Sequence, residues 1–431
     1  MKHAVGYAAR LLAVAFILLA TSVCGAAPAC ADETAPDSLR FQNDGTFTVL
    51  MLSDLQETQY PSPFLIRSVR GILNNYTVDL IVLLGDQLEG GSPVLRIGND
   101  YENVKRAIDR LLEPIEEAGV PFAVLFGNHD YDAPVSVNRQ MELYRARAGC
   151  LAAGGAAGEG GGYGAYALPV YGSESGDVAL NFYLFDSGAY LPNGDYAAVT
   201  PGQIAWYGEH AEALRAQNGN QPVPSVALMH VAVPEVYELF DEVPEGTEGA
   251  VEGVGAARGG YYTLDSERIF TGSALEAPCP SSENHGLFDA FIAQDDVFLA
   301  VFGHDHINSF IGSVRGIDLA SSPGSSYTSY GDPAVRGVRL FRFYEDHVKS
   351  YETLHVAFSD SEDVSGLNGV LYYLTTTTRI PNALKTLVLA VLLVGAMTVL
   401  LVLILKKEPP RRLPDQPEPD EDFEAPEDPY L

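Results

Sequence analysis

Phe126-Gly127-Asn128-His129-Asp130 closes an apolar run that covers residues 120–126. An apolar, β-branched run that ends in glycine is typical of a buried strand that stops at a tight turn. In an open α/β sheet, such a turn presents the next side chains at the carboxyl edge, where ligand sites form. Asn128 offers a neutral oxygen ligand, His129 an acid or base group, and Asp130 a carboxylate that can orient His129. These residue types also suit an ordinary turn, so the stretch indicates a ligand site only if other strand ends carry similar side chains.

Apolar runs that end in a polar side chain recur along the chain. The predicted strands cover residues 47–52, 79–84, 120–126, 178–185, 223–229 and 297–302, and the predicted helices cover residues 63–75, 101–118, 201–214 and 287–293. Alternating strands and helices imply a parallel sheet with right-handed crossovers, so that the strand ends share one edge. The first three strands then bring Asp54, Asp86 and Asn128 together.

The second half of the chain forms another strand series. Its strands end at Asp186, at His230 and at Gly303-His304-Asp305-His306. Residues 317–319 and 337–344 are expected to be antiparallel strands that close this second sheet. The Gly-rich stretches 149–177 and 241–284 are predicted loops, and the second of them is expected at the rim of a site.

Six side chains of metal-ligand type lie just past these strand ends: Asp54, Asp86, Asn128, His230, His304 and His306. Mixed oxygen and imidazole ligands suit Mn, Fe or Zn better than Ca or Mg. A single histidine at a strand end, such as His230, is more often structural. Six polar groups at one edge, however, would crowd one another without a cation. The set therefore predicts a metal site.

The full pattern resembles the calcineurin-like metallophosphoesterases and, within them, the branch similar to purple acid phosphatases. The resemblance covers residues 47–344 and rests on these stretches: Asp54-Leu55-Gln56, Gly85-Asp86, Gly127-Asn128-His129-Asp130, Tyr183-Leu184-Phe185-Asp186, Gln203-Ile204-Ala205-Trp206, Met229-His230 and Gly303-His304-Asp305-His306. It implies an α/β fold in which two sheets form a β-sandwich flanked by helices, in four layers.

The resemblance also implies a reaction and two divalent metal ions. The first ion would take Asp54, Gln56, Asp86 and His306, and the second would take Asp86 as a bridge with Asn128, His230 and His304. A hydroxide shared by the metals would attack a small phosphomonoester or phosphodiester, while His129, oriented by Asp130, protonates the leaving oxygen.

Two departures from the family pattern bear on this expectation. The family usually has histidine at the position of Gln56, and an amide oxygen is a weaker ligand for Fe or Zn, which favours Mn. Purple acid phosphatases have a tyrosine ligand at the position of Glu89, so no tyrosinate–iron colour is expected. Gln56 also leaves open a degenerate, non-catalytic binding domain of the same fold.

Composition argues against a nucleic-acid partner. Acidic residues outnumber basic ones by 57 to 26, which gives a net charge of −31. Such a surface repels a phosphate backbone, so a nuclease of the same fold is the weakest alternative.

Both ends of the chain carry membrane-targeting signals. Residues 1–31 have the layout of a signal peptide, and residues 383–405 are apolar enough to predict a transmembrane helix. The basic residues that follow predict a cytoplasmic tail at 406–431, which is acidic and Pro-rich, and a cell-membrane protein that spans the bilayer once. Residues 32–357 would then be an extracytoplasmic domain and 358–382 a juxtamembrane linker. In that compartment, Cys150 and Cys279 could form a disulfide.

Overall fold

The computed structural model describes residues 38–152, 163–361 and 382–405, and the strands of these residues form three sheets. The first sheet has the order β15-β14-β1-β2-β3, with bounds Glu352–Ala357, Gly337–Tyr344, Thr46–Leu52, Leu80–Leu84 and Phe122–Leu125. Strands β1, β2 and β3 run parallel, as the sequence predicts.

The predicted antiparallel strand at residues 337–344 is confirmed as β14, but it lies in the first sheet and not in the second, so its predicted place is wrong. It pairs antiparallel with β1, with Leu50 opposite Leu340. Sequence order favours pairing between strands that are close in the chain. Here the free edge of β1 is filled instead by a strand from the far end of the domain.

The second sheet has the order β10-β12-β13-β11-β6-β5-β4, with bounds Ile269–Thr271, Ile311–Val314, Ile317–Ser321, Val297–Phe302, Ser225–Met229, Val178–Leu184 and Tyr166–Tyr171. Strands β5, β6, β11 and β13 run parallel, whereas β12 is antiparallel to β13. The predicted strand at 317–319 is therefore confirmed in this sheet, although its partner β11 runs parallel to it.

Strand β4 falls in the stretch 149–177 that was predicted to be a loop. It is the edge strand of the second sheet and contains Pro169. Proline is tolerated at a sheet edge, where its missing N–H costs no ladder hydrogen bond. Because Pro169 and the many nearby glycines are typical of loops, the sequence does not predict this strand.

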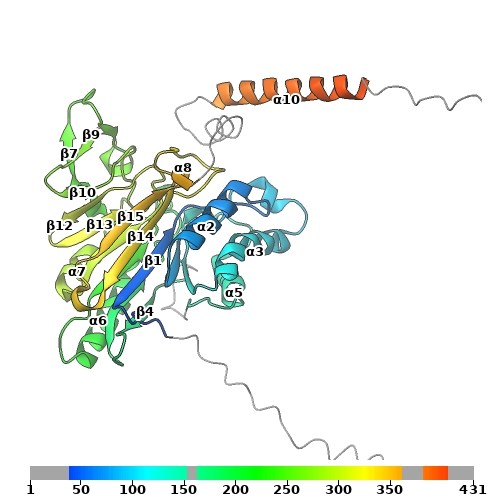
Figure 1. Ribbon diagram of the computed structural model, residues 1–431. Coiled ribbons are helices and arrows are strands. Elements are labelled where there is room, and N and C mark those ends of the chain that lie inside the picture. The colour runs from blue at the N-terminus through cyan, green and yellow to red at the C-terminus, as the bar shows by residue number, and fades with distance from the viewer. Residues whose placement is uncertain (1–37, 153–162, 362–381, 406–431) are drawn as a thin grey trace, which may run out of the picture. The chain divides into compact units, whose positions relative to one another are not determined.

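The two large sheets pack face to face through an aromatic core. The ring of Phe182 on β5 lies 6.3 Å from Phe47 on β1 and 6.0 Å from Phe343 on β14. Helices α2, α3 and α5 (Pro63–Asn75, Asp100–Ala118 and Val137–Arg145) lie beside the first sheet, and α6 and α7 (Pro201–Gln217 and Leu287–Gln294) beside the second (Figure 1). Tyr207 of α6 and Phe291 of α7 pack 5.3 Å apart against that sheet. The predicted sandwich of two sheets flanked by helices is confirmed.

A small third sheet occupies part of the stretch 241–284 that was predicted to be a rim loop. Its order is β7-β9-β8, with bounds Phe240–Val243, Tyr261–Leu264 and Val251–Glu252. The strands are two to four residues long, too short for an alternating pattern to be read from the sequence.

The shorter helical elements are η1 Pro93–Arg96, α4 Asn128–Tyr131, η3 Pro234–Leu239, η4 Gly255–Ala257, η5 Glu345–His347 and α8 Phe358–Ser361.

Helix α10 spans Asn382–Leu405 and belongs to a separate unit, which begins at Arg379. Among the described residues, no helix combines the length and apolarity that a membrane crossing requires. The predicted transmembrane helix at 383–405 therefore lacks structural support.

The signal peptide at 1–31, the tail at 406–431 and residues 362–381 of the linker lie outside the described residues. Cys150 and Cys279 are both free thiols.

Candidate metal centre

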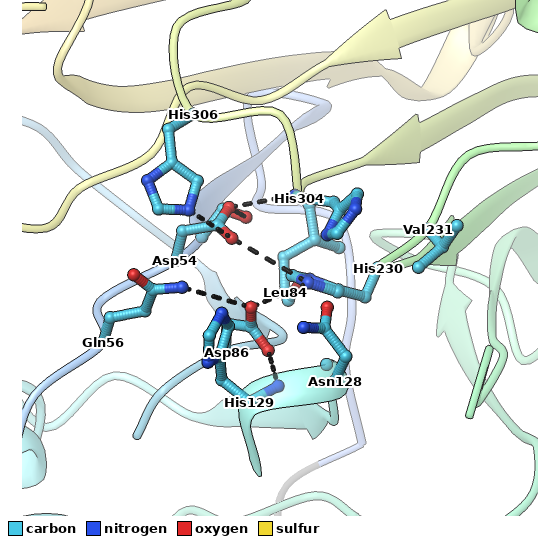
Figure 2. Close-up of polar contacts among 12 residues, drawn as sticks. Asp54, Gln56, Leu84, Asp86, Asn128, His129, His230, Val231, His304 and His306 are labelled. Atoms are coloured by element: carbon cyan, nitrogen blue, oxygen red, sulfur yellow. Dashed lines mark hydrogen bonds and ion pairs between the residues drawn. The ribbon is translucent and has the colours of Figure 1, made fainter. Parts of the chain in front are cut away.

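The strand ends of both large sheets meet at one edge, and the seven predicted metal ligands converge there (Figure 2). Asp54, Gln56, Asp86 and Asn128 follow strands of the first sheet, and His230, His304 and His306 follow strands of the second. All seven side chains are buried, and the most exposed of them, His304, is only 9% exposed. The structure therefore brings together every ligand that the sequence predicts.

The ligand atoms are close enough to share cations. Asp86, His230 and His304 each offer an atom within 4.8 Å of the others. Nε2 of His230 lies 3.2 Å from Oδ2 of Asp86 and 3.9 Å from Oδ1 of Asp54. Nε2 of His306 lies 3.3 Å from the same Asp54 oxygen. The two carboxylates thus occupy the middle of the cluster, with imidazoles on either side.

Hydrogen bonds from the outer ring nitrogens orient two of the imidazoles. Nδ1 of His230 donates to the carbonyl of Leu84 at 3.0 Å, and Nδ1 of His306 donates to the carbonyl of Tyr330 at 3.0 Å. A carbonyl can only accept, so both rings carry their proton on Nδ1. Each Nε2 is then directed into the cluster, which is the usual arrangement of a metal-binding histidine.

Four buried atoms at the centre have no hydrogen-bond partner among the described residues: Asp54 Oδ1, Gln56 Oε1, Asn128 Oδ1 and His230 Nε2. Buried polar atoms are nearly always paired, because an unpaired one costs the free energy of its lost hydration. All four are metal-ligand types, and cations would satisfy them together. The residues present therefore fit divalent metal ions.

Charges within the cluster shift its pKa values. Burial raises the pKa of Asp54, but His306 and His230 outweigh burial and hold it below the ordinary value. Burial lowers the pKa of His230, but Asp86 and Asp54 outweigh burial and raise it to about 10. Burial and the neighbouring His230 lower the pKa of His304 to about 3, which keeps its imidazole neutral.

The backbone is left-handed at four of the seven ligands. The φ angles are 53° at Asp54, 43° at Gln56, 54° at Asp86 and 72° at His304. Residues other than glycine seldom adopt this conformation, which persists only where the surrounding structure enforces it and which clusters at functional sites. The turns after the strands are thus held in a conformation that directs ligands inward at a cost in backbone energy.

His129 lies at the border of the cluster, in the one-turn helix α4. Its backbone N–H donates to Oδ1 of Asp86 at 2.7 Å, and its side chain is 31% exposed. Nδ1 lies 3.9 Å from a carboxylate oxygen of Glu89 and 3.9 Å from one of Asp132. His129 is therefore the predicted site residue that combines contact with the cluster and access to solvent.

Asp130 does not orient His129, contrary to the prediction. Its two carboxylate oxygens accept hydrogen bonds from the backbone N–H groups of Gly127 and Leu88, both at 3.0 Å. The carboxylate is fully buried, and it ties the turn after β3 to the segment after β2. A helical turn points adjacent side chains in different directions, so sequence neighbours such as His129 and Asp130 do not face each other.

Tyr190 is a site residue that the sequence did not reveal. Its hydroxyl accepts a hydrogen bond from Nδ2 of Asn128 at 2.9 Å. It lies in the segment that follows β5, four residues past Asp186 at the strand end. Only its place after a strand of the second sheet could have pointed to it.

A cavity of about 710 Å³ opens over the cluster. The predicted residues Gln56, Asp86, His129, His304 and His306 all contribute to its lining. Pockets of roughly 300–1,000 Å³ are typical of small-molecule sites. The cluster is therefore open to a ligand of that size.

The chain is similar to a known family and to known proteins. The family model described as calcineurin-like phosphoesterase matches residues 47–308. The chain is 25% identical over 365 residues to an Arabidopsis thaliana protein named "Probable inactive purple acid phosphatase 14", a match that covers 77% of this chain and 82% of that protein. It is 26% identical over 332 residues to "Probable inactive purple acid phosphatase 28" of the same plant, covering 68% and 74%. Among solved structures, a dimetal phosphatase from Danio rerio matches with a TM-score of 0.42 and 12% identity, covering 73% of this chain and 99% of that one.

Proposed function

Since the chain belongs to the calcineurin-like phosphoesterase family, we propose that it hydrolyses small phosphoesters with the help of two divalent metal ions. The observation that carries this proposal is the set of four buried, unpaired ligand atoms from both sheets. Three of the four atoms are amide or carboxylate oxygens, which can only accept hydrogen bonds and so cannot pair with one another, whereas a pair of cations would satisfy them.

The ligands divide between two sites that share Asp86. Asp54, Gln56, Asp86 and His306 would hold one ion, and Asp86, Asn128, His230 and His304 would hold the other. Bound ions supply a Lewis acid for the phosphoryl oxygens and lower the pKa of water toward neutrality. Because Gln56 offers an amide oxygen where an imidazole would favour Fe or Zn, Mn is the expected metal.

His129 would act as the general acid. In hydrolysis, the oxygen of water joins phosphorus, the bond from phosphorus to the alcohol oxygen breaks, and that oxygen takes up a proton. The His129 imidazole is accessible to a ligand in the cavity, and the carboxylates of Glu89 and Asp132 lie 3.9 Å from its Nδ1. Asp130 contributes by fixing the backbone of the turn that carries His129.

The alternative is a domain that binds a phosphoester without hydrolysing it. The names of the two Arabidopsis relatives and the weak ligand Gln56 favour this alternative. The intact set of the other six ligands and the accessible His129 favour catalysis, because a domain that only binds has no need of a general acid. Hydrolysis by the purified protein separates the two functions.

The test is a metal-dependent assay on the full-length chain. Hydrolysis of nitrophenyl phosphate or bis-nitrophenyl phosphate should stop on chelation and recover best with Mn. Asp86→Asn should lose both ions and all activity, because it removes the shared carboxylate. Asp289→Asn, whose side chain is 75% exposed in α7, is the matched control and should keep both. Two ions per chain in Asp86→Asn would contradict the shared ligand, and bound metal without hydrolysis in the native protein would favour the binding domain.

The location is a separate proposal that rests on the sequence alone. Residues 1–31 and 383–405 favour a domain outside the cytoplasm that is attached to the membrane by one helix. Protease added to intact cells should then remove the domain while an epitope in residues 406–431 survives. A domain that is cut only after lysis would overturn this topology.

A further inference from the structure

The wall of the cavity beyond the metal ligands is acidic. Glu89, Glu252, Glu276 and Asp305 line it, whereas no lysine or arginine of the described residues does. Glu252 comes from β8, so the small third sheet forms part of this wall. Under the proposed function, cations at the metal centre would hold the phosphoryl group. The acidic wall therefore faces the rest of the substrate, the alcohol part.

Two tyrosines continue the cavity directly from the ligand histidines. The ring of Tyr330 stacks on the imidazole of His306, with centroids 4.1 Å apart and planes within 9°. The ring of Tyr196 meets His304 edge to face, also at 4.1 Å. Both tyrosines line the cavity. A group that extends from the metal centre into the cavity therefore meets aromatic rings before it reaches solvent.

Glu276 is held in place beside these rings. Its Oε1 accepts hydrogen bonds from the backbone N–H of Ile307 at 2.9 Å and from the hydroxyl of Tyr330 at 3.2 Å. Both of these hydrogen bonds use Oε1, so they leave Oε2 of Glu276 available to a ligand in the cavity. Apolar side chains of Val251, Val254 and Leu275 complete the wall.

A carboxylate beside aromatic rings favours one class of group and disfavours another. Ammonium groups are attracted to the faces of aromatic rings by about 0.5–2 kcal/mol and to carboxylates by charge. Additional phosphates or carboxylates on the alcohol part would face Glu276 and Glu89 with no basic residue to offset the repulsion. A neutral alkyl group would fill the cavity but gain nothing from the carboxylates.

We propose that the substrate is a phosphoester of an amino alcohol, in which an alkylammonium group lies between Tyr196, Tyr330 and Glu276. This inference rests on the proposed phosphoesterase function and names the substrate class of the same site. The metal centre holds the phosphoryl group, and the acidic, aromatic wall selects the alcohol by its positive charge.

The test compares two esters of nearly the same shape. Phosphocholine and 3,3-dimethylbutyl phosphate differ by one positive charge, and both can be supplied as monoesters and as methyl diesters. The full-length, Mn-loaded protein should have a kcat/KM about 10-fold higher for the charged member of each pair. Glu276→Gln keeps the acceptor for Ile307 and Tyr330 but loses the charge, so the ratio between the two esters should fall toward one. Glu212→Gln, on the exposed face of α6, is the control and should leave the ratio unchanged.

Each outcome bears on a different claim. Equal or faster hydrolysis of the neutral ester would overturn the substrate class and leave the phosphoesterase function standing. An unchanged ratio in Glu276→Gln would remove Glu276 as the selecting group and overturn the proposal in this form. Hydrolysis of neither pair, in a protein that carries two metal ions, would overturn the proposed function and the substrate class with it.

Discussion

The hydroxyl of Tyr190 accepts a hydrogen bond from the amide nitrogen of Asn128 at 2.9 Å and donates one to a carboxylate oxygen of Asp132 at 3.1 Å. The bond fixes the orientation of the Asn128 amide, because its nitrogen is engaged and its oxygen is left facing the metal centre without a partner. Asp132 in turn lies 3.9 Å from Nδ1 of His129. One tyrosine thus connects a predicted metal ligand with the surroundings of the predicted general acid.

Tyr190→Phe should weaken metal binding. Without the hydroxyl, the Asn128 amide can rotate and present its nitrogen to the cation, and loss of such an orienting partner typically costs about 10–100-fold in metal affinity. Mn titration of the metal-free protein measures the effect on the affinity of the site that includes Asn128. Tyr60→Phe, at a side chain that is 70% exposed, is the control. Unchanged Mn affinity in Tyr190→Phe would show that packing alone orients Asn128.

The strands that carry ligands could be predicted because they are buried on both faces. The segments Leu80–Leu84 and Ser225–Met229 are buried along their whole length, so they read as continuous apolar runs with a sharp polar end. The ligands follow directly from those ends. The metal centre could therefore be predicted from the positions of the strand ends, and no single motif was sufficient.

The features that the sequence hid depend on long-range contacts. Strand β14 pairs with β1 across almost the whole domain, and no local pattern reports such pairing. Tyr190 acts through a hydrogen bond to a residue 62 positions away. Asp130 is adjacent to His129 in the sequence, but its carboxylate accepts a hydrogen bond from the N–H of Leu88, 42 positions away, so adjacency does not predict its role.

Gly127→Ala should damage the metal centre by steric overlap alone. A Cβ at this position would lie 2.2 Å from Oδ1 of Asp86 and 2.6 Å from Nε2 of His230, although the φ of −109° suits any residue. Both neighbours are buried and cannot move without losing their place in the cluster. We expect loss of bound metal and of hydrolysis together, as measured by elemental analysis and an aryl phosphate assay.

Gly71→Ala provides the matched control for this substitution. Gly71 lies inside α2, and a Cβ there meets nothing within 4 Å. Alanine is favoured over glycine in a helix by about 0.5–1 kcal/mol, so this variant should be slightly more stable and fully metal-loaded. Normal metal content in Gly127→Ala would mean that the centre tolerates a shift that the observed packing forbids.

Metal loading should release protons near neutral pH. In the metal-free protein, burial lowers the pKa of His230 and His306, but Asp86 and Asp54 outweigh burial and raise it, for His230 to about 10. The His230 imidazole is then protonated at pH 7, and the raised pKa of His306 favours its protonated form, so a cation can bind these side chains only after displacing a proton. Loading should release about one to two protons per chain, and apparent affinity should increase as pH rises.

Calorimetric Mn titrations in buffers of different ionisation enthalpy count these protons. His347→Ala, which removes a surface imidazole that is 52% exposed, should leave the count unchanged. No proton release at pH 7 would mean that the imidazoles are already neutral before the metal binds, against the pKa shifts within the cluster.

His129 and Asp130 should separate into a catalytic and a structural role. His129→Ala removes no predicted metal ligand, so it should keep its metal and lose about 10²–10⁴-fold in rate on an alkyl ester. The loss should be smaller for nitrophenyl phosphate, whose leaving group needs little protonation.

Asp130→Asn should behave differently, because an amide can replace only one of the two oxygens that accept from Gly127 and Leu88. One buried N–H is then left unpaired, which should lower the free energy of unfolding by about 1–3 kcal/mol. Thermal or urea unfolding of the metal-free protein measures that loss, and the ratio of alkyl to aryl hydrolysis should stay at the native value. If Asp130→Asn changed this ratio as His129→Ala does, Asp130 would act on the proton transfer after all, and if His129→Ala lost equal rate on both esters, His129 would not be the general acid.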